Sequence, residues 1–301
     1  MTELQKKVRQ TALEKGVCIL AHYYQTMDIQ QIADFVGDSF ELARKAVSAP
    51  QDTLCFCGVR FMAEGAKLLS PNKTVLFPVW DAGCPMADMV TASDVTALRA
   101  ANPGAAVVCY VNSTAEVKAV SDICCTSSSA ERVVRSLPQD TVIFVPDRNL
   151  GTYIAALVPE KKFVLFDGHC PIHHRVTAAD ARRALEVHPE ARLLVHPECI
   201  PEVTALADGV GSTSWILSEV ERTEAGQSFI IGTEVGVLER LRVTSPGRRM
   251  WLLKDGFVCP NMKKTTLEDV LRCIETGAPE MTLPDELAEK ARESLRKMVE
   301  A

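Results

Sequence analysis

Short runs of apolar residues alternate along the chain with longer segments in which apolar residues recur every three or four positions. The short runs are rich in Val, Ile and Leu, as in VVCY from Val107 and LLVH from Leu193, and the longer segments have the pattern of amphipathic helices. This alternation is typical of small parallel sheets that are covered by helices on both faces. The sequence therefore predicts an α/β fold built of αβα sandwiches.

The pattern occurs three times, in units that read strand, helix, helix, strand, helix, strand, helix. The third strand of each unit ends at a Cys-Pro dipeptide, and the three cysteines, at positions 84, 170 and 259, are 86 and 89 residues apart. Turns that contain Pro or Gly separate the units. We predict three homologous domains at residues 1–103, 104–190 and 191–279, with the tail 280–301 forming a helix that packs on the first domain.

Several polar residues also occur once in each unit. They are His22, Tyr110 and His196 at the end of the first strand; Tyr24, Asn112 and Glu198 two positions later; Asp34, Asp122 and Asp208; Ser39, Ser127 and Thr213 before a helix; and Asp94, Asp180 and Asp269 after the Cys-Pro dipeptide. Ligands of parallel α/β units bind at the carboxyl ends of the strands. A single hydroxyl residue before a helix is usually only an N-cap, but the recurrence in three units favours a shared site with seats for phosphate or carboxylate.

The three Cys-Pro cysteines suggest one metal centre, with one ligand from each unit. A closed zinc site needs four ligands and usually has C-x-x-C pairs, which this chain lacks. A [4Fe–4S] cluster on three thiolates would leave one iron free to act as a Lewis acid. Cys18, Cys55, Cys57, Cys109 and Cys273 fall in apolar segments and are expected in the core, as are the adjacent Cys124 and Cys125. Cys199 remains an open alternative ligand, and His169 and His173 could lie beside the centre.

Composition narrows the class of protein. The 301 residues are 47% hydrophobic and carry a net charge of −6, with no basic stripe, so we expect no nucleic-acid partner. No apolar run approaches the roughly 20 residues needed to cross a bilayer, and the first residues lack the pattern of a secretory signal. The eleven cysteines then fit a reducing compartment. We expect a cytoplasmic protein without membrane contact.

Several longer motifs are similar to those of a known enzyme family. They are AHYYQ from Ala21, VGDSFELA from Val36, DAGCPMADM from Asp81, YVNSTAEVKA from Tyr110, CTSSSA from Cys125, DGHCPIHHRV from Asp167, HPEC from His196, GSTSW from Gly211 and GTEVGVLERL from Gly232. Over essentially its whole length the chain resembles quinolinate synthase, the A-type iron–sulfur enzyme of NAD biosynthesis. The resemblance implies three Rossmann-like αβα domains around a pseudo-threefold axis. It also implies condensation of iminoaspartate with dihydroxyacetone phosphate to quinolinate, with loss of phosphate and two waters.

The resemblance also implies the residues of the site. The [4Fe–4S] cluster would be held by Cys84, Cys170 and Cys259, and the substrates would contact His22, Tyr24, Ser39, Tyr110, Asn112, Ser127, His173, His196, Glu198, Ser212 and Thr213. Tyr24, His196 and Glu198 are the candidates for the proton transfers. An aspartate oxidase or dehydrogenase is the expected supplier of iminoaspartate. Two alternatives stay open: a cluster-dependent hydro-lyase acting on a hydroxy acid, and an iron–sulfur redox sensor without catalysis.

Overall fold

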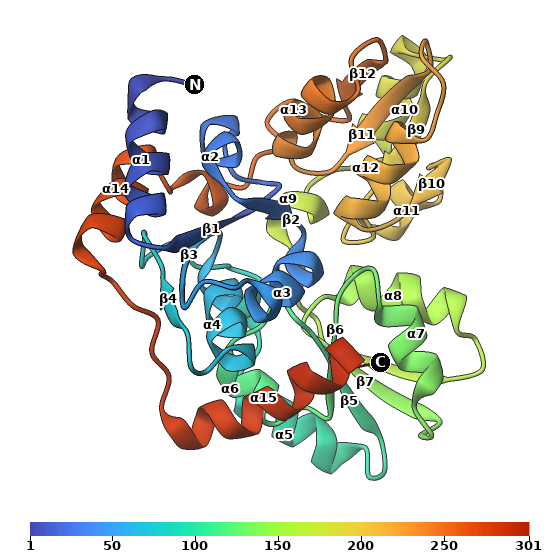
Figure 1. Ribbon diagram of the computed structural model, residues 1–301. Helices are drawn as coiled ribbons and strands as arrows, with labels where there is room; N and C mark the ends of the chain where they lie inside the picture. Colours follow the sequence, from blue (N-terminus) through green and yellow to red (C-terminus); the bar gives the residue numbers. More distant parts are fainter. Residues whose placement is uncertain (301) are drawn as a thin grey trace.

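Each of the three sequence repeats folds into a four-stranded parallel sheet flanked by helices (Figure 1). The computed structural model describes residues 1–300. The strand orders are β2-β1-β3-β4, β6-β5-β7-β8 and β10-β9-β11-β12, so the three units share one topology. The predicted α/β class with three Rossmann-like αβα units is confirmed.

The elements are as follows. The first unit contains α1 (Glu3–Glu14), β1 (Val17–His22), α2 (Met27–Ile32), β2 (Phe35–Gly37), α3 (Ser39–Ser48), β3 (Thr53–Cys57), α4 (Arg60–Leu69), β4 (Thr74–Leu76) and the 3-10 turn η1 (Ala87–Met89). The second contains α5 (Ala92–Ala101), β5 (Ala106–Tyr110), α6 (Ala115–Ala119), β6 (Ile123–Cys125), α7 (Ala130–Ser136), β7 (Thr141–Val145), α8 (Arg148–Leu157), β8 (Lys162–Leu165) and α9 (Pro171–His174). The third contains α10 (Ala178–Val187), β9 (Arg192–Val195), α11 (Pro201–Thr204), β10 (Gly209–Val210), α12 (Thr213–Glu221), β11 (Ser228–Gly232), α13 (Val235–Thr244), β12 (Arg249–Leu252) and the 3-10 turn η2 (Asn261–Lys263), followed by α14 (Leu267–Thr276) and α15 (Asp285–Glu300).

The predicted order of elements omitted one short strand in each unit, namely β2, β6 and β10. Each has only two or three residues, which is too short to show the alternation that identifies a strand. The repeated aspartates directly precede these strands. The side chains of Asp34, Asp122 and Asp208 accept a hydrogen bond from a backbone N–H near the start of β1, β5 and β9 at 2.7 to 2.8 Å. They therefore extend the pairing of the two strands.

The loop that carries each Cys-Pro dipeptide leads the chain from one unit to the next. The helix that follows the loop packs on the next unit: α5 on α6 and β7, α10 on α11, and α14 on α1 and β3. The sequence repeat placed these helices at the end of the unit that precedes them, whereas packing associates them with the unit that follows. Because α14 returns to the first sheet, the three units close into a ring.

The C-terminal helix α15 lies across two units (Figure 1). It packs on α4 of the first unit and also on α6 and β6 of the second. Arg292 donates to the Leu68 carbonyl at 2.8 Å, and Ser294 donates to the Lys118 carbonyl at 2.9 Å. The helix thus joins the first unit to the second.

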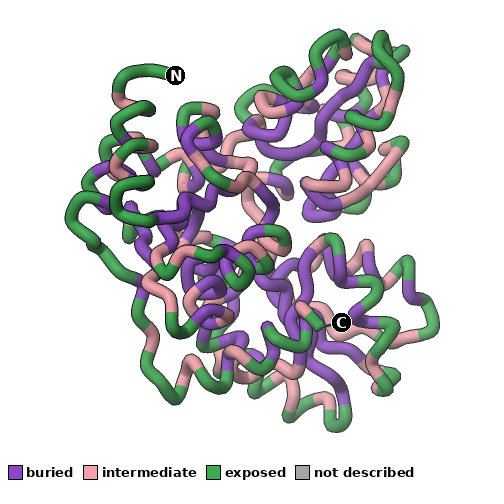
Figure 2. Tube along the Cα trace, viewed as in Figure 1, coloured by how far each residue is buried: buried purple, intermediate pink, exposed green. Residues whose placement is uncertain are grey.

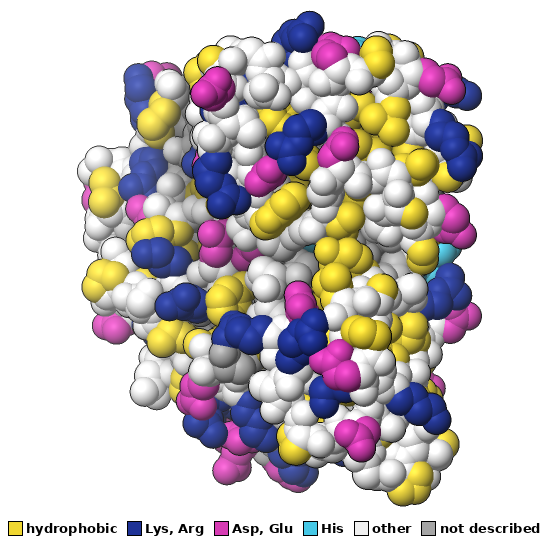
Figure 3. Space-filling model, turned by 90° about the vertical axis from the view of Figure 1, so that its right-hand side faces the viewer, with side chains coloured by type: hydrophobic (Ala, Val, Ile, Leu, Met, Phe, Trp, Pro, Cys, Tyr) yellow, Lys and Arg dark blue, Asp and Glu magenta, His cyan; other side chains and the backbone are white. Residues whose placement is uncertain are grey.

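Burial follows the sheets, whose strands are the most continuously buried segments (Figure 2). Every residue of β1, β5 and β11 is buried, as expected for parallel strands covered on both faces. On the face shown in Figure 3, Lys and Arg side chains are interspersed with Asp and Glu, without an extended area of one sign. None of the helices within residues 1–300 is long and apolar enough to cross a membrane.

Candidate active site

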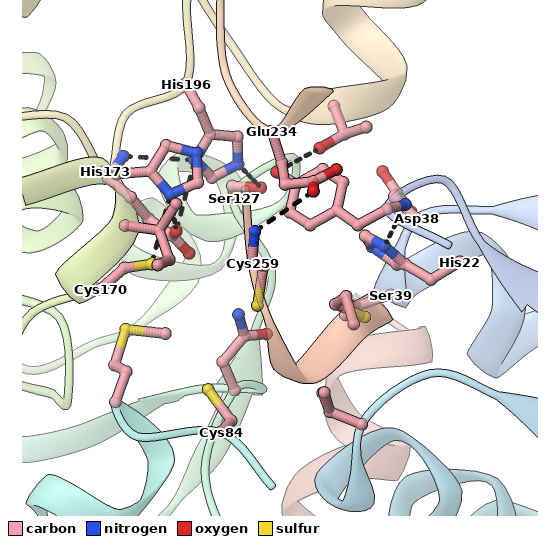
Figure 4. A pocket seen from close by; sticks show the side chains of 18 of the residues that line it. His22, Asp38, Ser39, Cys84, Ser127, Cys170, His173, His196, Glu234 and Cys259 are labelled. Atoms are coloured by element: carbon pink, nitrogen blue, oxygen red, sulfur yellow. Dashed lines mark hydrogen bonds and ion pairs between the residues drawn. The ribbon is translucent and has the colours of Figure 1, made fainter. Parts of the chain in front are cut away.

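A pocket lies between the three units (Figure 4). His22, Tyr110 and His196, at the carboxyl ends of β1, β5 and β9, are among the residues that line it. It has about 730 Å³ of empty space, part of which is open to solvent. Of the residues proposed from the sequence, those that line the pocket are His22, Tyr24, Ser39, Cys84, Tyr110, Asn112, Ser127, Cys170, His173, His196, Glu198, Thr213 and Cys259. Three separate domains therefore contribute to a single site.

The three Cys-Pro cysteines stand at the start of short helical turns, and their sulfur atoms face a shared space (Figure 4). In α9, Pro171 takes the first helical position, which suits proline because it has no N–H to leave unpaired. Backbone N–H groups favour the ionised form of each sulfur: those of Met86 and Ala87 at Cys84, that of His173 at Cys170, and those of Asn261 and Met262 at Cys259. Such N–H groups stabilise a thiolate.

Without a cation, the three thiols resist ionisation. Burial raises the pKa of Cys84 to about 12 and raises the pKa values of Cys170 and Cys259 as well, although the N–H groups oppose the change. A bound metal reverses this effect because it favours the thiolate directly. Three thiols that are half-buried, turned to one space and supplied with N–H donors fit a thiolate-bound metal centre.

Cys170 also belongs to a tighter group with His173 and Glu198, whose potential ligand atoms lie within 4.8 Å of one another. These residues could hold a metal ion. However, both ring nitrogens of His173 already have protein partners: Nδ1 is 2.8 Å from Glu198 Oε2, and Nε2 is 3.0 Å from Thr233 Oγ1. The geometry therefore fits a hydrogen-bonded group beside the cysteines at least as well as a separate ion site.

A chain of hydrogen bonds runs along one wall of the pocket. The Tyr24 hydroxyl is 2.8 Å from Thr233 Oγ1, which in turn contacts His173 Nε2. On the far side of His173, Glu198 accepts a hydrogen bond from the Tyr110 hydroxyl at 2.7 Å. The chain connects Tyr24 of the first unit to Tyr110 of the second through three residues, two of them on the third unit, and it can pass protons between them.

Two histidines at equivalent strand ends are held neutral. His22 Nδ1 accepts the Tyr24 N–H at 3.0 Å, and His196 Nδ1 accepts the Glu198 N–H at 3.3 Å. Burial lowers the pKa of His22 to about 3 and that of His196 to about 4. A neutral ring that accepts at Nδ1 carries its proton on Nε2, and His196 Nε2 is 3.2 Å from Ser127 Oγ. Both rings thus offer a donor to the pocket.

Glu198 has opposing influences on its charge. Burial would raise the pKa of its carboxyl, but the nearby His196 and His173, with hydrogen bonds from His173 and Tyr110, hold that pKa below its usual range. Burial, together with the nearby Glu198 carboxylate, raises the pKa of Tyr110. The wall therefore combines an ionised acid with protonated phenols.

The hydroxyl residues occupy different positions. Ser39 and Thr213 are the first residues of α3 and α12, and Asp38 and Ser212 are the actual N-caps. Ser212 lines a separate outer groove with Ser128 and Ser214 and is absent from the lining of the central pocket. Asn112 Oδ1 is buried without a hydrogen-bond partner among residues 1–300, and a buried orphan acceptor in a pocket indicates a ligand contact.

The remaining cysteines lie elsewhere. Cys199 is buried in the third unit with its sulfur 3.7 Å from the Gly232 carbonyl, and it does not line the central pocket. Cys124 and Cys125 are buried in β6. Sequence reasoning missed Thr233 and Glu234, which immediately follow β11; their position at the edge of the sheet where the other polar residues gather was the available signal.

Comparison with known proteins agrees with this geometry. The family model described as Quinolinate synthetase A protein matches residues 6–300. The quinolinate synthase of Methanoregula boonei is 54% identical over 296 residues, which cover 98% of this chain and 97% of that protein. The quinolinate synthase of Caldicellulosiruptor saccharolyticus is 47% identical over 99% of this chain and 98% of that protein. That of Geobacter metallireducens is also 47% identical, over 98% of this chain and 97% of that protein. The chain therefore belongs to the quinolinate synthase family, the enzymes of NAD biosynthesis that are also described as quinolinate synthetase A proteins.

Proposed function

We propose that the pocket condenses iminoaspartate with dihydroxyacetone phosphate to quinolinate, releasing phosphate and two waters. The observation that carries the proposal is that three thiols, two neutral histidines and several hydroxyl groups line one pocket in a chain of this family. One substrate brings two carboxylates and the other a phosphate. An acidic protein has to bind such anions with local groups rather than with its overall charge.

Local groups for anions are present on two helix starts. Asp38 accepts from the N–H groups of Phe40 and Glu41, while no hydrogen bond within residues 1–300 uses the N–H of Ser39 or Thr213. These N–H groups and hydroxyls lie at the positive ends of α3 and α12, where phosphate and carboxylate are favoured. The Nε2–H groups of the two neutral histidines add donors without adding charge.

The cofactor in this proposal is a [4Fe–4S] cluster held by Cys84, Cys170 and Cys259. The three thiols have N–H donors of their own and face one space, whereas no fourth cysteine lines the pocket. When bound, such a cluster supplies an iron without a protein ligand, which can act as a Lewis acid on a substrate oxygen. Tyr24 and Glu198 line the same pocket as the three thiols.

The protein's own residues would move the protons. Tyr24 can pass a proton through Thr233 and His173 to Glu198, and the same route can return it. Formation of the imine, isomerisation and ring closure each require a proton to leave one atom and reach another. A relay that begins and ends in the pocket serves both directions without admitting bulk water.

The central experiment is anaerobic reconstitution with iron and sulfide, followed by analysis of bound iron and an assay for quinolinate. We expect about four irons per chain in the wild type and loss of most of the cluster in Cys84→Ser, Cys170→Ser and Cys259→Ser. Cys199→Ser is the matched control, because Cys199 is buried beside Glu198 but lies outside the pocket lining. Full cluster content in any of the three variants would remove that cysteine from the ligand set.

The chemistry of iminoaspartate also implies a partner. The imine hydrolyses readily in water, so an aspartate oxidase or dehydrogenase should supply it in the same compartment, for which we propose the cytoplasm. Addition of such an enzyme with aspartate should support quinolinate formation, and preformed oxaloacetate without ammonia should not.

A further inference from the structure

Two buried carboxylates lie directly behind two of the cysteine loops. Asp147 is fully buried and caps α8: its Oδ1 accepts the Leu150 N–H at 2.8 Å. Its second oxygen, Oδ2, accepts the N–H of Cys170 at 3.0 Å. One side chain thus fixes both the start of a helix and the backbone of a proposed cluster ligand.

Glu234 has the same position in the third unit. It is fully buried and caps α13, with Oε2 accepting the Gly236 N–H at 2.7 Å. Its Oε1 accepts the N–H of Cys259 at 3.2 Å and lies 3.0 Å from Lys263 Nζ. The two carboxylates are therefore equivalent in the internal repeat, although one is Asp and the other Glu.

The first unit lacks this contact. The N-cap of α4 is the apolar Val59, and the Cys84 N–H has no hydrogen-bond acceptor among residues 1–300. The loops are otherwise alike, since the first N–H of each helix binds the carbonyl two residues before the cysteine: Arg60 to Ala82, Arg148 to Gly168 and Val235 to Phe257. Only two of the three cysteine loops are thus hydrogen-bonded, or tied, to a buried carboxylate.

Each tied loop is also linked to a proposed proton-transfer residue of the next unit. Asn149, two residues after Asp147, donates to the Glu198 carbonyl at 2.9 Å. Lys263, which pairs with Glu234, donates to the Tyr24 carbonyl at 2.6 Å. Asp147 with Asn149, and Glu234 with Lys263, therefore each connect a cysteine loop to the backbone of a proposed acid–base residue.

We propose that Asp147 and Glu234 are positioning residues that fix Cys170 and Cys259 relative to Glu198 and Tyr24, and that Cys84 is the ligand left free to adjust. The proposal rests on the cluster proposed above. A ligand whose backbone is fixed needs less reorganisation when iron binds, so its bond to iron is lost more slowly. The contacts to the Glu198 and Tyr24 carbonyls would hold these two residues in a fixed position relative to Cys170 and Cys259.

The test compares Asp147→Asn and Glu234→Gln with wild type after anaerobic reconstitution. Each variant keeps one acceptor oxygen and replaces the other by an amide that cannot accept the second N–H. We expect iron to be lost to a ferrous chelator at least tenfold faster, with an altered electron paramagnetic resonance spectrum of the reduced cluster. Thr177→Val and Thr266→Val are matched controls, because each removes the N-cap of the helix after the same cysteine loop without touching a cysteine N–H.

Equal iron release from wild type and both carboxylate variants would overturn the proposal, and so would equally fast release from the threonine controls, since the acids would then act only as caps. If one carboxylate variant does not fold, the equivalent variant in the other unit supplies the test. Failure of the wild type itself to bind iron would refute the proposed cluster, and with it the positioning role that rests on that cluster.

Asn149→Ala separately tests the contact between the start of α8 and Glu198. It removes the bond to the Glu198 carbonyl and leaves the Asp147 contact with Cys170 in place. We expect iron retention within twofold of wild type, with kcat per bound cluster lowered about tenfold and KM little changed. An unchanged kcat would show that Asp147 fixes the cysteine alone, contrary to the proposal.

Discussion

At the scale of single residues, the N–H two positions after His22 and His196 decides which ring nitrogen carries the proton. Each Nδ1 accepts that N–H, so protonation of the ring requires the hydrogen bond to break inside a buried pocket. In the proposed function, the two histidines would therefore be neutral donors to bound anions. Their role differs from that of Lys or Arg, which would hold an anion by charge.

These two histidines contribute to the pH dependence of stability. Burial places their folded pKa values at about 3 and about 4, whereas an unfolded histidine titrates near 6.5. Between these values the unfolded chain binds more protons, so stability is complete above about pH 6.5 and falls as pH drops towards 4, by at most about 1.4 kcal/mol per pH unit per histidine. Urea unfolding of the metal-free protein at several pH values measures the slope.

A variant checks the source of that slope. His22→Asn keeps an acceptor near the position of Nδ1 for the Tyr24 N–H but cannot titrate. We expect a smaller decrease in stability between pH 6.5 and 4 than in the wild type. A decrease as large as in the wild type would assign the effect to other groups.

Replacement of Glu198 tests the proton relay. Glu198→Gln keeps the size of the side chain but cannot take a proton, so we expect kcat to fall by roughly 10² to 10⁴ while iron content stays at the wild-type level. Glu202→Gln, on the exposed start of α11, is the control and should change kcat by less than twofold. Full turnover of Glu198→Gln with an intact cluster would exclude the proposed role.

Most candidate site residues were predicted from a feature that recurs in all three units, and His173 from its place beside Cys170. Thr233, which belongs to neither group, was missed. Thr233 directly follows β11, and its contacts depend on the distances to Tyr24 and His173 across two unit boundaries. No local pattern encodes such a distance. The repeated Asp34, Asp122 and Asp208 stand out equally well in the sequence, yet their contacts extend strand pairing.

At the scale of elements, two helical glycines have opposite surroundings. A methyl group on Gly65 in α4 would meet no atom within 4 Å, whereas one on Gly151 in α8 would lie 2.6 Å from Leu165 and 3.0 Å from Phe144. We expect Gly65→Ala to stabilise the protein by about 1 kcal/mol through helix propensity, and Gly151→Ala to destabilise it by roughly 1 to 3 kcal/mol through overpacking. Urea unfolding of both variants measures the difference; stabilisation of both would contradict the packing described for α8.

Strands and helices of ordinary length were predictable from periodicity, and the two- and three-residue strands were not. Their pairing is specified by the neighbouring strand and by an aspartate side chain, and not by their own alternation. The helices after the Cys-Pro dipeptides were predicted as elements. The sheet that each one covers depends on tertiary packing, which the repeat does not reveal.

At the scale of the whole molecule, α15 packs against both the first and the second unit and holds them together. Leu295 is fully buried between them. Leu295→Ala should lower the free energy of unfolding by roughly 2 to 5 kcal/mol, as large-to-small core substitutions do. The neighbouring, exposed Arg296→Ala should change it by less than about 0.5 kcal/mol. If Leu295→Ala and Arg296→Ala lowered the free energy of unfolding equally, the packing of α15 would not stabilise the contact between the two units.

The return of α14 to the first sheet has a consequence for synthesis on the ribosome. Residues 267–276 are made after about nine-tenths of the chain, and until then one side of the first sheet has only α1 and α2 to cover Ile19 and Cys55. The first unit made is thus the last to be finished, against the usual N-terminal-first order of domain folding. Nascent chains stalled before residue 267 should be cleaved by protease in the first unit, and those released after it should resist.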